Sequence, residues 1–162
     1  MTEERIKQLM ESMTLEEKVG QMFQASGVFF EEGSVLTGPM QKMGLEESAV
    51  DLAGSVIGIQ DAVSMRRIQE RFMERHPHKI PLLFMMDVIN GYRTVFPIPL
   101  AQGASFEPKL SERCARAAAA EASASGIHVT FAPMADLVRD ARWGRVMEST
   151  GEDPWLNGKF SE

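Results

Sequence analysis

Residues 128–154 read HVTFAPMADLVRDARWGRVMESTGEDP, and this stretch decides how the rest of the chain is interpreted. It opens as a strand pattern, because the apolar residues Ile127, Val129 and Phe131 share one parity. After Pro133 aliphatic residues are scarce and charged ones gather: Asp136, Arg139, Asp140, Arg142, Arg145, Glu148, Glu152 and Asp153. A strand that leads into a long polar loop is how α/β barrels present functional residues at one rim. The stretch therefore predicts an α/β fold with a functional loop after this strand.

The charged loop has two explanations. Most charge-rich loops are solvated surface segments laced with ion pairs. Trp143, placed between Arg142 and Arg145, argues against that explanation, because a solvated loop has no need of an aromatic side chain. Planar guanidinium groups beside an aromatic ring suit a flat, hydroxylated ligand. Arg142, Trp143 and Arg145 are therefore candidate ligand-binding residues.

Strand and helix patterns alternate before this loop. Strands are expected at residues 19–25, 53–59, 80–88 and 127–131. Helices are expected at residues 2–13, after a capping box formed by Thr14 and Glu17, after an Asp61 cap, at residues 108–125, and from Pro154 onward. The helix after Asp61 has an apolar stripe made by Met65, Ile68 and Phe72. Such alternation indicates a parallel sheet with right-handed crossovers.

Several segments have less distinctive patterns. Residues 31–47, rich in Gly and Met, are expected to form a loop or an irregular insertion, and residues 96–100 (FPIPL) an extended connector. Two histidines surround a proline at residues 76–78; they lack further ligands at suitable spacing for a metal, so an exposed loop is expected. His128 shares the parity of Thr130, which favours a satisfied interior histidine over a catalytic one.

Length and composition limit the function. A chain of 162 residues is long enough for one domain with a core, whereas a complete (β/α)8 barrel needs about 250 residues. A net charge of −6 argues against nucleic acid as a partner. The single cysteine, Cys114, excludes an internal disulfide, suits a reducing compartment and is expected to be a buried thiol. No apolar run has the length of a signal peptide core or a membrane span, so a cytoplasmic location without membrane contact is expected.

Three segments carry a resemblance to a known family. The segment FAPMADLVRDARWGRVMESTGEDP resembles the signature segment of glycoside hydrolase family 3, the family of many bacterial β-glucosidases. MTLEEKVGQM at residues 13–22 and IPLLFMMDVINGYRTVFPIPLAQGASF at residues 80–106 resemble the same family, in the same order. The resemblance implies that residues 1–162 are a single partial domain. That domain would be the first half, about four βα units, of a (β/α)8 TIM-type barrel with a parallel sheet and outer helices.

Asp87 stands at the C-terminal end of the strand expected at residues 80–88. An ionised carboxylate against an apolar strand is costly unless it is paired, so Asp87 either partners an arginine or awaits a polar ligand. The resemblance implies the second use: Asp87 would be a buried carboxylate accepting hydrogen bonds from hydroxyls of the non-reducing glucose. It implies that Arg145 contacts the same sugar, with Arg142 and Trp143 as further substrate-binding candidates or braces of the loop.

The resemblance also implies what this chain lacks. The family's nucleophile, general acid and sugar-binding Lys-His pair belong to segments absent from this sequence, so no catalytic residue is expected here. The full-length enzyme would hydrolyse terminal non-reducing β-D-glucosyl residues of a β-glucoside or related oligosaccharide. It would act by a retaining double displacement. Neither a metal nor an organic cofactor would be needed, and the 162-residue chain would be inactive alone.

The sequence leaves one alternative function open and excludes another. A non-catalytic half-barrel could bind sugar or act as a scaffold, and would self-associate through its open sheet edges. A doubly wound nucleotide-binding domain is excluded, because no Gly-rich phosphate loop follows any expected strand.

Overall fold

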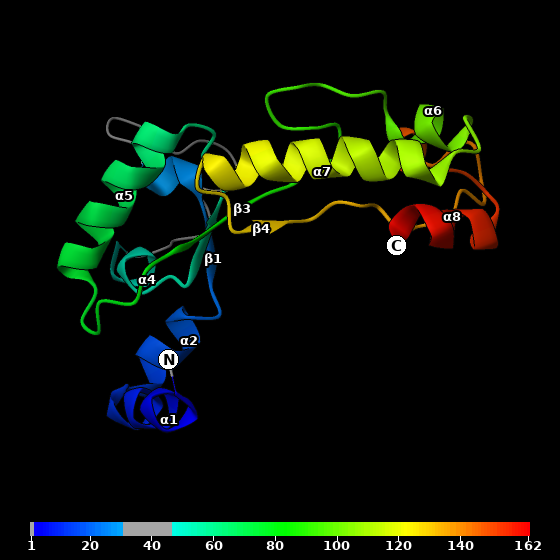
Figure 1. The fold of residues 1–162 in the computed structure, drawn as a ribbon. Helices are drawn as coiled ribbons and strands as arrows, with labels where there is room; N and C mark the ends of the chain where they lie inside the picture. Colours follow the sequence, from blue (N-terminus) through cyan, green and yellow to red (C-terminus); the bar gives the residue numbers. More distant parts are fainter. Residues whose placement is uncertain (1, 31–46) are drawn as a thin grey trace. The chain divides into compact units, whose positions relative to one another are not determined.

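The structure, a computed structural model, describes residues 2–30 and 47–162 (Figure 1). The chain divides into two compact units, Met1–Met85 and Met86–Glu162. The loop expected at residues 31–47 lies outside the described residues except for Glu47, where α4 (Glu47–Asp51) begins. The single partial domain expected over residues 1–162 stays a prediction.

One four-stranded sheet runs through the chain in the order β1-β2-β3-β4. Its strands are β1 (Gln24–Ser26), β2 (Ser55–Ile57), β3 (Leu83–Met86) and β4 (Val129–Thr130). β2 pairs in parallel with both β1 and β3, and helices lie between the strands in the sequence. The predicted α/β class with a parallel sheet is therefore confirmed, and β1 and β4 are the sheet edges.

The N-terminal helices follow their local signals. α1 (Glu3–Ser12) begins after Thr2, whose side chain accepts a hydrogen bond from the Arg5 amide. α2 (Leu15–Gly20) begins at the predicted capping box, in which Thr14 and Glu17 exchange backbone-to-side-chain bonds of 2.7 and 3.2 Å. The strand expected at residues 19–25 is wrong in its first part, since the helix that this box starts runs on to Gly20 and β1 begins only at Gln24.

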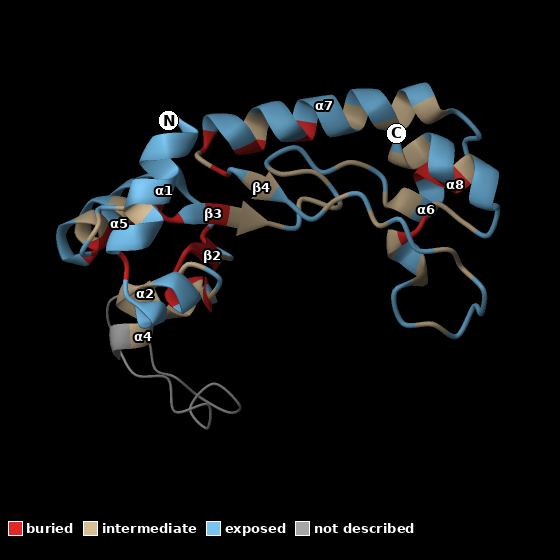
Figure 2. Ribbon diagram, turned by 90° about the horizontal axis from the view of Figure 1, so that it is seen from below, coloured by how far each residue is buried: buried red, intermediate tan, exposed pale blue. Residues whose placement is uncertain are grey.

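The core of the first unit lies between α5 (Ala62–Arg75) and the sheet. Asp61 caps α5 by accepting from the Ser64 amide at 2.8 Å, and the predicted stripe is buried: Met65, Ile68 and Phe72. On β3, Phe84 faces the core and is 3% exposed, whereas its neighbour Leu83 is 45% exposed (Figure 2).

The turn after α5 also differs from its prediction. His76 was expected in an exposed loop, yet it is the C-cap of α5 and is fully buried. Its ring lies against Phe72, with centroids 5.3 Å apart, and against the side chain of Gln21, which is distant in the sequence. Nδ1 lies 3.2 Å from the His78 amide nitrogen and 3.3 Å from that of Ile80.

The second unit is built on a long helix, α7 (Pro108–Ala124). Three shorter helices complete it: α6 (Pro99–Gly103), the 3-10 helix η2 (Val146–Glu148) and α8 (Pro154–Ser161). α6 and α8 contact α7 near its N-terminal end (Figure 1). As predicted, α7 ends before Gly126, which has a φ of 102°, and Asp153 caps α8. The connector expected at residues 96–100 is wrong at its end, where Pro99 begins α6.

Candidate functional site

Asp87 directly follows β3, at the carboxyl end of the strand. Its backbone carbonyl accepts a 2.8 Å hydrogen bond from Thr130 Oγ1, and the Met86 carbonyl accepts one of 3.2 Å from the Phe131 amide. β4 thus fixes the backbone that carries the carboxylate. The side chain of Asp87 is exposed, so the expectation of a buried carboxylate is wrong. The residue lies beyond the last strand residue, at the rim, where no neighbouring strand covers it.

The backbone turns sharply after Asp87. Val88 has a φ of 54°, in the left-handed region that β-branched residues avoid. Such a conformation costs about 1–3 kcal/mol and is found most often at functional sites. Gly91 has a φ of 94°, and a Cβ there would lie 2.0 Å from the Thr94 carbonyl oxygen, so only glycine fits. The strained turn supports a functional role for the segment that begins at Asp87.

Glu121 of α7 anchors the far end of that turn. Its carboxylate accepts hydrogen bonds from the Arg93 amide at 2.9 Å, the Thr94 amide at 2.8 Å and Thr94 Oγ1 at 2.6 Å. The bonds from Thr94, ahead of those from Arg93, lower the pKa of Glu121. Sequence reasoning missed this residue. The available signal was a single charged residue in the otherwise uncharged segment 117–124.

Arg145 is held by a carboxylate of its own loop. Its Nε and Nη2 atoms donate to the same oxygen, Glu148 Oε2, at 3.0 and 2.5 Å, while Nη1 takes no part in this pair. The hydrogen bond to Glu148 is the main cause of a raised Arg145 pKa, and the charges of Asp136 and Asp87 add to it. Asp87 and Arg145 are both predicted to bind sugar, and the charge of Asp87 contributes to the raised pKa of Arg145.

The loop that carries Arg145 is closed by buried polar side chains. Ser149 is fully buried; its Oγ donates to the Asp136 carbonyl at 2.6 Å and accepts from the Gly151 amide at 3.3 Å. Asn157 of α8 donates to Thr150 Oγ1 at 2.9 Å. These bonds fix the two ends of the loop, residues 136–151, against each other. Nothing in the sequence distinguished Ser149 from an ordinary loop serine.

Arg142 and Trp143 are organised by Asp140. The Arg142 guanidinium donates to both carboxylate oxygens of Asp140, with Nε at 3.0 Å and Nη2 at 2.6 Å. These bonds, ahead of one from the Arg142 amide, lower the pKa of Asp140. The Trp143 amide donates to the Asp140 carbonyl at 3.0 Å, and its side chain is half-buried. This geometry favours bracing of the loop over sugar contact for Arg142. The assignment of Arg142 and Trp143 to the substrate site stays a prediction.

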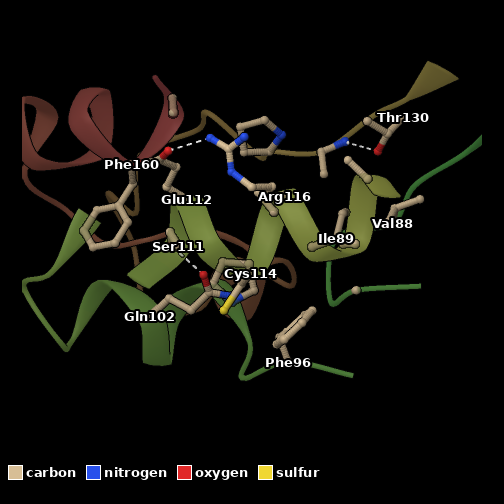
Figure 3. Close-up of a pocket in the computed structure, with 18 of the residues that line it drawn as sticks. Val88, Ile89, Phe96, Gln102, Ser111, Glu112, Cys114, Arg116, Thr130 and Phe160 are labelled. Carbon is tan, nitrogen blue, oxygen red and sulfur yellow. Dashed lines mark hydrogen bonds and ion pairs between the residues drawn. The ribbon is translucent and has the colours of Figure 1, made fainter. Parts of the chain in front are cut away.

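A pocket of about 1020 Å³ lies in the second unit, between α7, β4 and α8 (Figure 3). Val88 and Thr130 line it, but Asp87, Arg142, Trp143 and Arg145 do not. Its α7 wall carries an Arg116–Glu112 ion pair of 2.8 Å and a hydrogen bond from Ser111 to Gln102. The pocket is therefore separate from the candidate sugar residues.

Two residues on the pocket wall differ from expectation. Cys114, expected to be a buried thiol, is half-buried. His128, expected in the interior, is exposed because it precedes an edge strand of only two residues.

Residues 2–30 and 47–162 contain no group of three or more His, Cys, Asp or Glu side chains arranged to hold a metal ion. None of the helices that the structure describes has the length and apolar character needed to cross a membrane.

Residues 14–162 match the family described as Glycosyl hydrolase family 3 N terminal domain. The periplasmic β-glucosidase of Salmonella typhimurium is 35% identical over 159 residues, which are 97% of this chain and 20% of that protein. A putative β-xylosidase of Formosa agariphila is 34% identical over 165 residues, covering 95% of this chain and 22% of that protein. The crystal structure of the Listeria innocua β-glucosidase in complex with glucose superposes with a TM-score of 0.91 at 50% identity. That likeness covers 99% of this chain and 23% of the other.

These likenesses confirm the predicted fold class, the first part of a (β/α)8-type barrel. The chain spans only about a fifth of the length of the curated relatives that it matches over nearly its whole length.

Proposed function

The chain belongs to glycosyl hydrolase family 3, and on that premise we propose that it supplies the wall that holds the terminal sugar in a β-glucoside-hydrolysing enzyme. The observation that carries the proposal is the position of Asp87, whose exposed side chain stands directly after β3 on backbone that Thr130 fixes; its charge also contributes to the raised pKa of Arg145. The β-glucosidase names of its relatives, and the glucose and laminaribiose bound to the Listeria innocua enzyme, support this substrate class.

The chemistry of the two side chains suits a sugar ring. The Asp87 carboxylate is exposed and accepts hydrogen bonds only, so it can take two from neighbouring hydroxyls. Arg145 keeps Nη1 outside its pair with Glu148 and can donate to the same ring. Charge-assisted bonds of this kind are shorter and stronger than neutral ones, and they orient the ring for attack.

We place the reacting carboxyl groups outside these 162 residues. A retaining glycosidase needs a nucleophile and an acid with carboxyl groups about 5–5.5 Å apart. Four carboxylates of the second unit already have structural partners: Glu148 with Arg145, Asp140 with Arg142, Glu121 with Thr94, and Asp153 with the Leu156 amide. The chain by itself is then expected to bind sugar without turnover.

Calorimetric binding of glucose and laminaribiose to the chain tests the proposal. Asp87→Ala should abolish binding, because it removes the carboxylate that accepts the hydroxyl hydrogen bonds. Asp51→Ala is the matched control, since Asp51 is a half-buried aspartate of the other unit that pairs with Arg75. Equal binding by wild type and Asp87→Ala would remove Asp87 from the site.

In parallel with the calorimetric titration, hydrolysis of an aryl β-glucoside is measured at high protein concentration. No turnover by the folded chain is expected. Turnover that falls in Asp87→Ala would place the catalytic pair among the carboxylates of this chain.

A scaffold that self-associates is the second candidate function. The observation that favours it is the presence of two sheet edges, β1 and β4, with Phe131 next to β4 exposed to 46%. Sedimentation equilibrium would show a concentration-dependent dimer without sugar affinity if this candidate is right.

The cytoplasmic location expected from the sequence stays a prediction.

A further inference from the structure

We propose that His76 is an acid-sensitive latch: its neutral ring ties the turn at residues 76–80 to α2, and protonation of the ring releases the turn. This inference concerns the first unit alone and does not depend on sugar binding. It goes beyond the proposed function by giving this part of the chain a response to pH.

The ring of His76 organises the turn from its centre. The residue is fully buried, and its amide donates to the Phe72 carbonyl at 2.9 Å as the last bond of α5. Nδ1 accepts from two backbone amides of the turn, those of His78 at 3.2 Å and Ile80 at 3.3 Å. One ring nitrogen thus satisfies two backbone donors of the part-buried turn.

The tautomer follows from this count of donors. A ring nitrogen that accepts two N–H bonds carries no hydrogen, so the hydrogen of the neutral ring is on Nε2. Gln21 Nε2 lies 3.2 Å from Nε2 of His76 and donates to the Leu52 carbonyl at 3.4 Å, so an Nε2–H ring requires the Gln21 amide to turn its oxygen toward the ring and give up the Leu52 bond. The opposite tautomer keeps both Gln21 bonds but sets Nδ1–H against two fixed backbone donors. Because an amide can rotate and the two backbone donors cannot, the Nε2–H tautomer is favoured.

The surroundings disfavour a charged ring. Burial is the main cause of a lowered His76 pKa, followed by the charges of His78 and Lys79 from the turn, while Glu17 of α2 opposes them. Glu17 pairs with His78 Nε2 at 3.1 Å, so its charge is shared with a second histidine. α5 contributes Phe72, whose ring centroid is 5.3 Å from that of His76. These are the charged and ring groups that face His76 in the described part of the chain.

Protonation would break the latch at one atom. A proton on Nδ1 turns the acceptor of the turn into a donor, which then faces the amides of His78 and Ile80. Those amides lose their partner and the turn must open to water. Since the pKa of His76 is lower folded than unfolded, the stabilisation is complete above the ordinary histidine pKa of about 6.5 and is lost as pH falls below it.

Glu17 adds a second, more acidic stage. The hydrogen bond from the Thr14 backbone, followed by that from His78, lowers its pKa. The contribution of Glu17 is therefore present above the ordinary glutamate pKa of about 4.3 and is lost as pH falls below it. Protonation of either side chain destabilises the folded turn. As the pH falls, the effect of His76 comes before that of Glu17.

Nuclear magnetic resonance on the full chain tests the latch. The ¹⁵N shifts of the His76 ring at pH 8 should identify Nδ1 as the bare acceptor and Nε2 as the protonated nitrogen. Between pH 8 and pH 5, the hydrogen-exchange protection factors of the His78 and Ile80 amides should fall at least tenfold, while those of the α7 amides change less than twofold. An Nδ1–H tautomer, or protection that stays constant over this range, would overturn the proposal.

Two variants extend the test. His76→Asn should remove the dependence on pH between 8 and 5, whereas His128→Gln, which changes an exposed histidine of the other unit, should keep it. If His76→Asn does not fold, the two measurements on the wild-type chain still decide the proposal.

Discussion

Two polar segments, the turn at residues 76–80 and the loop at residues 136–151, are each held by one fully buried polar side chain. His76 bonds the amides of its turn, and Ser149 bonds the Asp136 carbonyl and the Gly151 amide. The difference lies in what each segment presents. The turn binds back onto α2, whereas the loop exposes Arg142 and Arg145. A buried polar side chain thus packs a turn against α2 in the first unit, whereas in the second unit it holds a loop that exposes two arginines.

The comparison also separates a titratable anchor from one that does not titrate. A hydroxyl keeps its hydrogen-bonding roles across the physiological pH range, whereas an imidazole changes from acceptor to donor at Nδ1. Acid is therefore expected to loosen the turn of the first unit and to leave the anchor of the sugar loop intact. Candidate sugar-binding residues would then keep their places under conditions that disturb the first unit.

The largest effect is expected from removing the histidine anchor. His76→Ala leaves two half-buried amides without their acceptor and opens a cavity beside Phe72, which should cost roughly 2–4 kcal/mol of unfolding free energy. Urea unfolding followed by far-ultraviolet circular dichroism measures it. Both tryptophans, Trp143 and Trp155, belong to the second unit, so their fluorescence reports that unit separately. An equal shift of both transitions would show that the anchor supports more than its own turn.

A smaller effect is expected from removing the serine anchor. Ser149→Ala leaves the Asp136 carbonyl and the Gly151 amide short of a buried partner, at a cost of about 1–2 kcal/mol. The tryptophan transition in urea should move, and sugar affinity should fall because Arg145 is less well placed. Ser161→Ala is the control: its hydroxyl donates to the Asn157 carbonyl, four residues earlier in α8. Equal unfolding free energies for Ser149→Ala and Ser161→Ala would mean that the Ser149 hydroxyl does not anchor the loop.

The features that the sequence predicted correctly are the local ones. The capping box of Thr14 and Glu17, the cap at Asp61 and the stop at Gly126 each depend on residues within four positions of one another. His76 was misjudged because its burial depends on Gln21, a residue 55 positions away. No local pattern encodes such a contact, so the sequence predicts an exposed loop for this histidine next to a proline.

The candidate site shows the same division. The partners of Arg142 and Arg145 lie two and three residues away and could have been inferred from the spacing of charges in the loop. Asp87 and Arg145 could be assigned to one site only through the resemblance to a family, because α6, α7 and β4 lie between them in the sequence. Glu121 and Ser149 were missed for the same reason, since each bonds backbone that chain folding brings to it.

The smallest effect is expected at Arg142, and it sharpens the comparison within the loop. The Arg142 side chain is 90% exposed and its guanidinium is taken up by Asp140, so Arg142→Ala should change sugar affinity less than twofold. Arg145→Ala should abolish detectable binding in the same calorimetric titration, because its Nη1 is the donor proposed for the sugar. The two variants remove the same charge from one loop and differ only in position. Equal losses would mean that the positive field of the loop, rather than the individual placement of Arg145, holds the sugar.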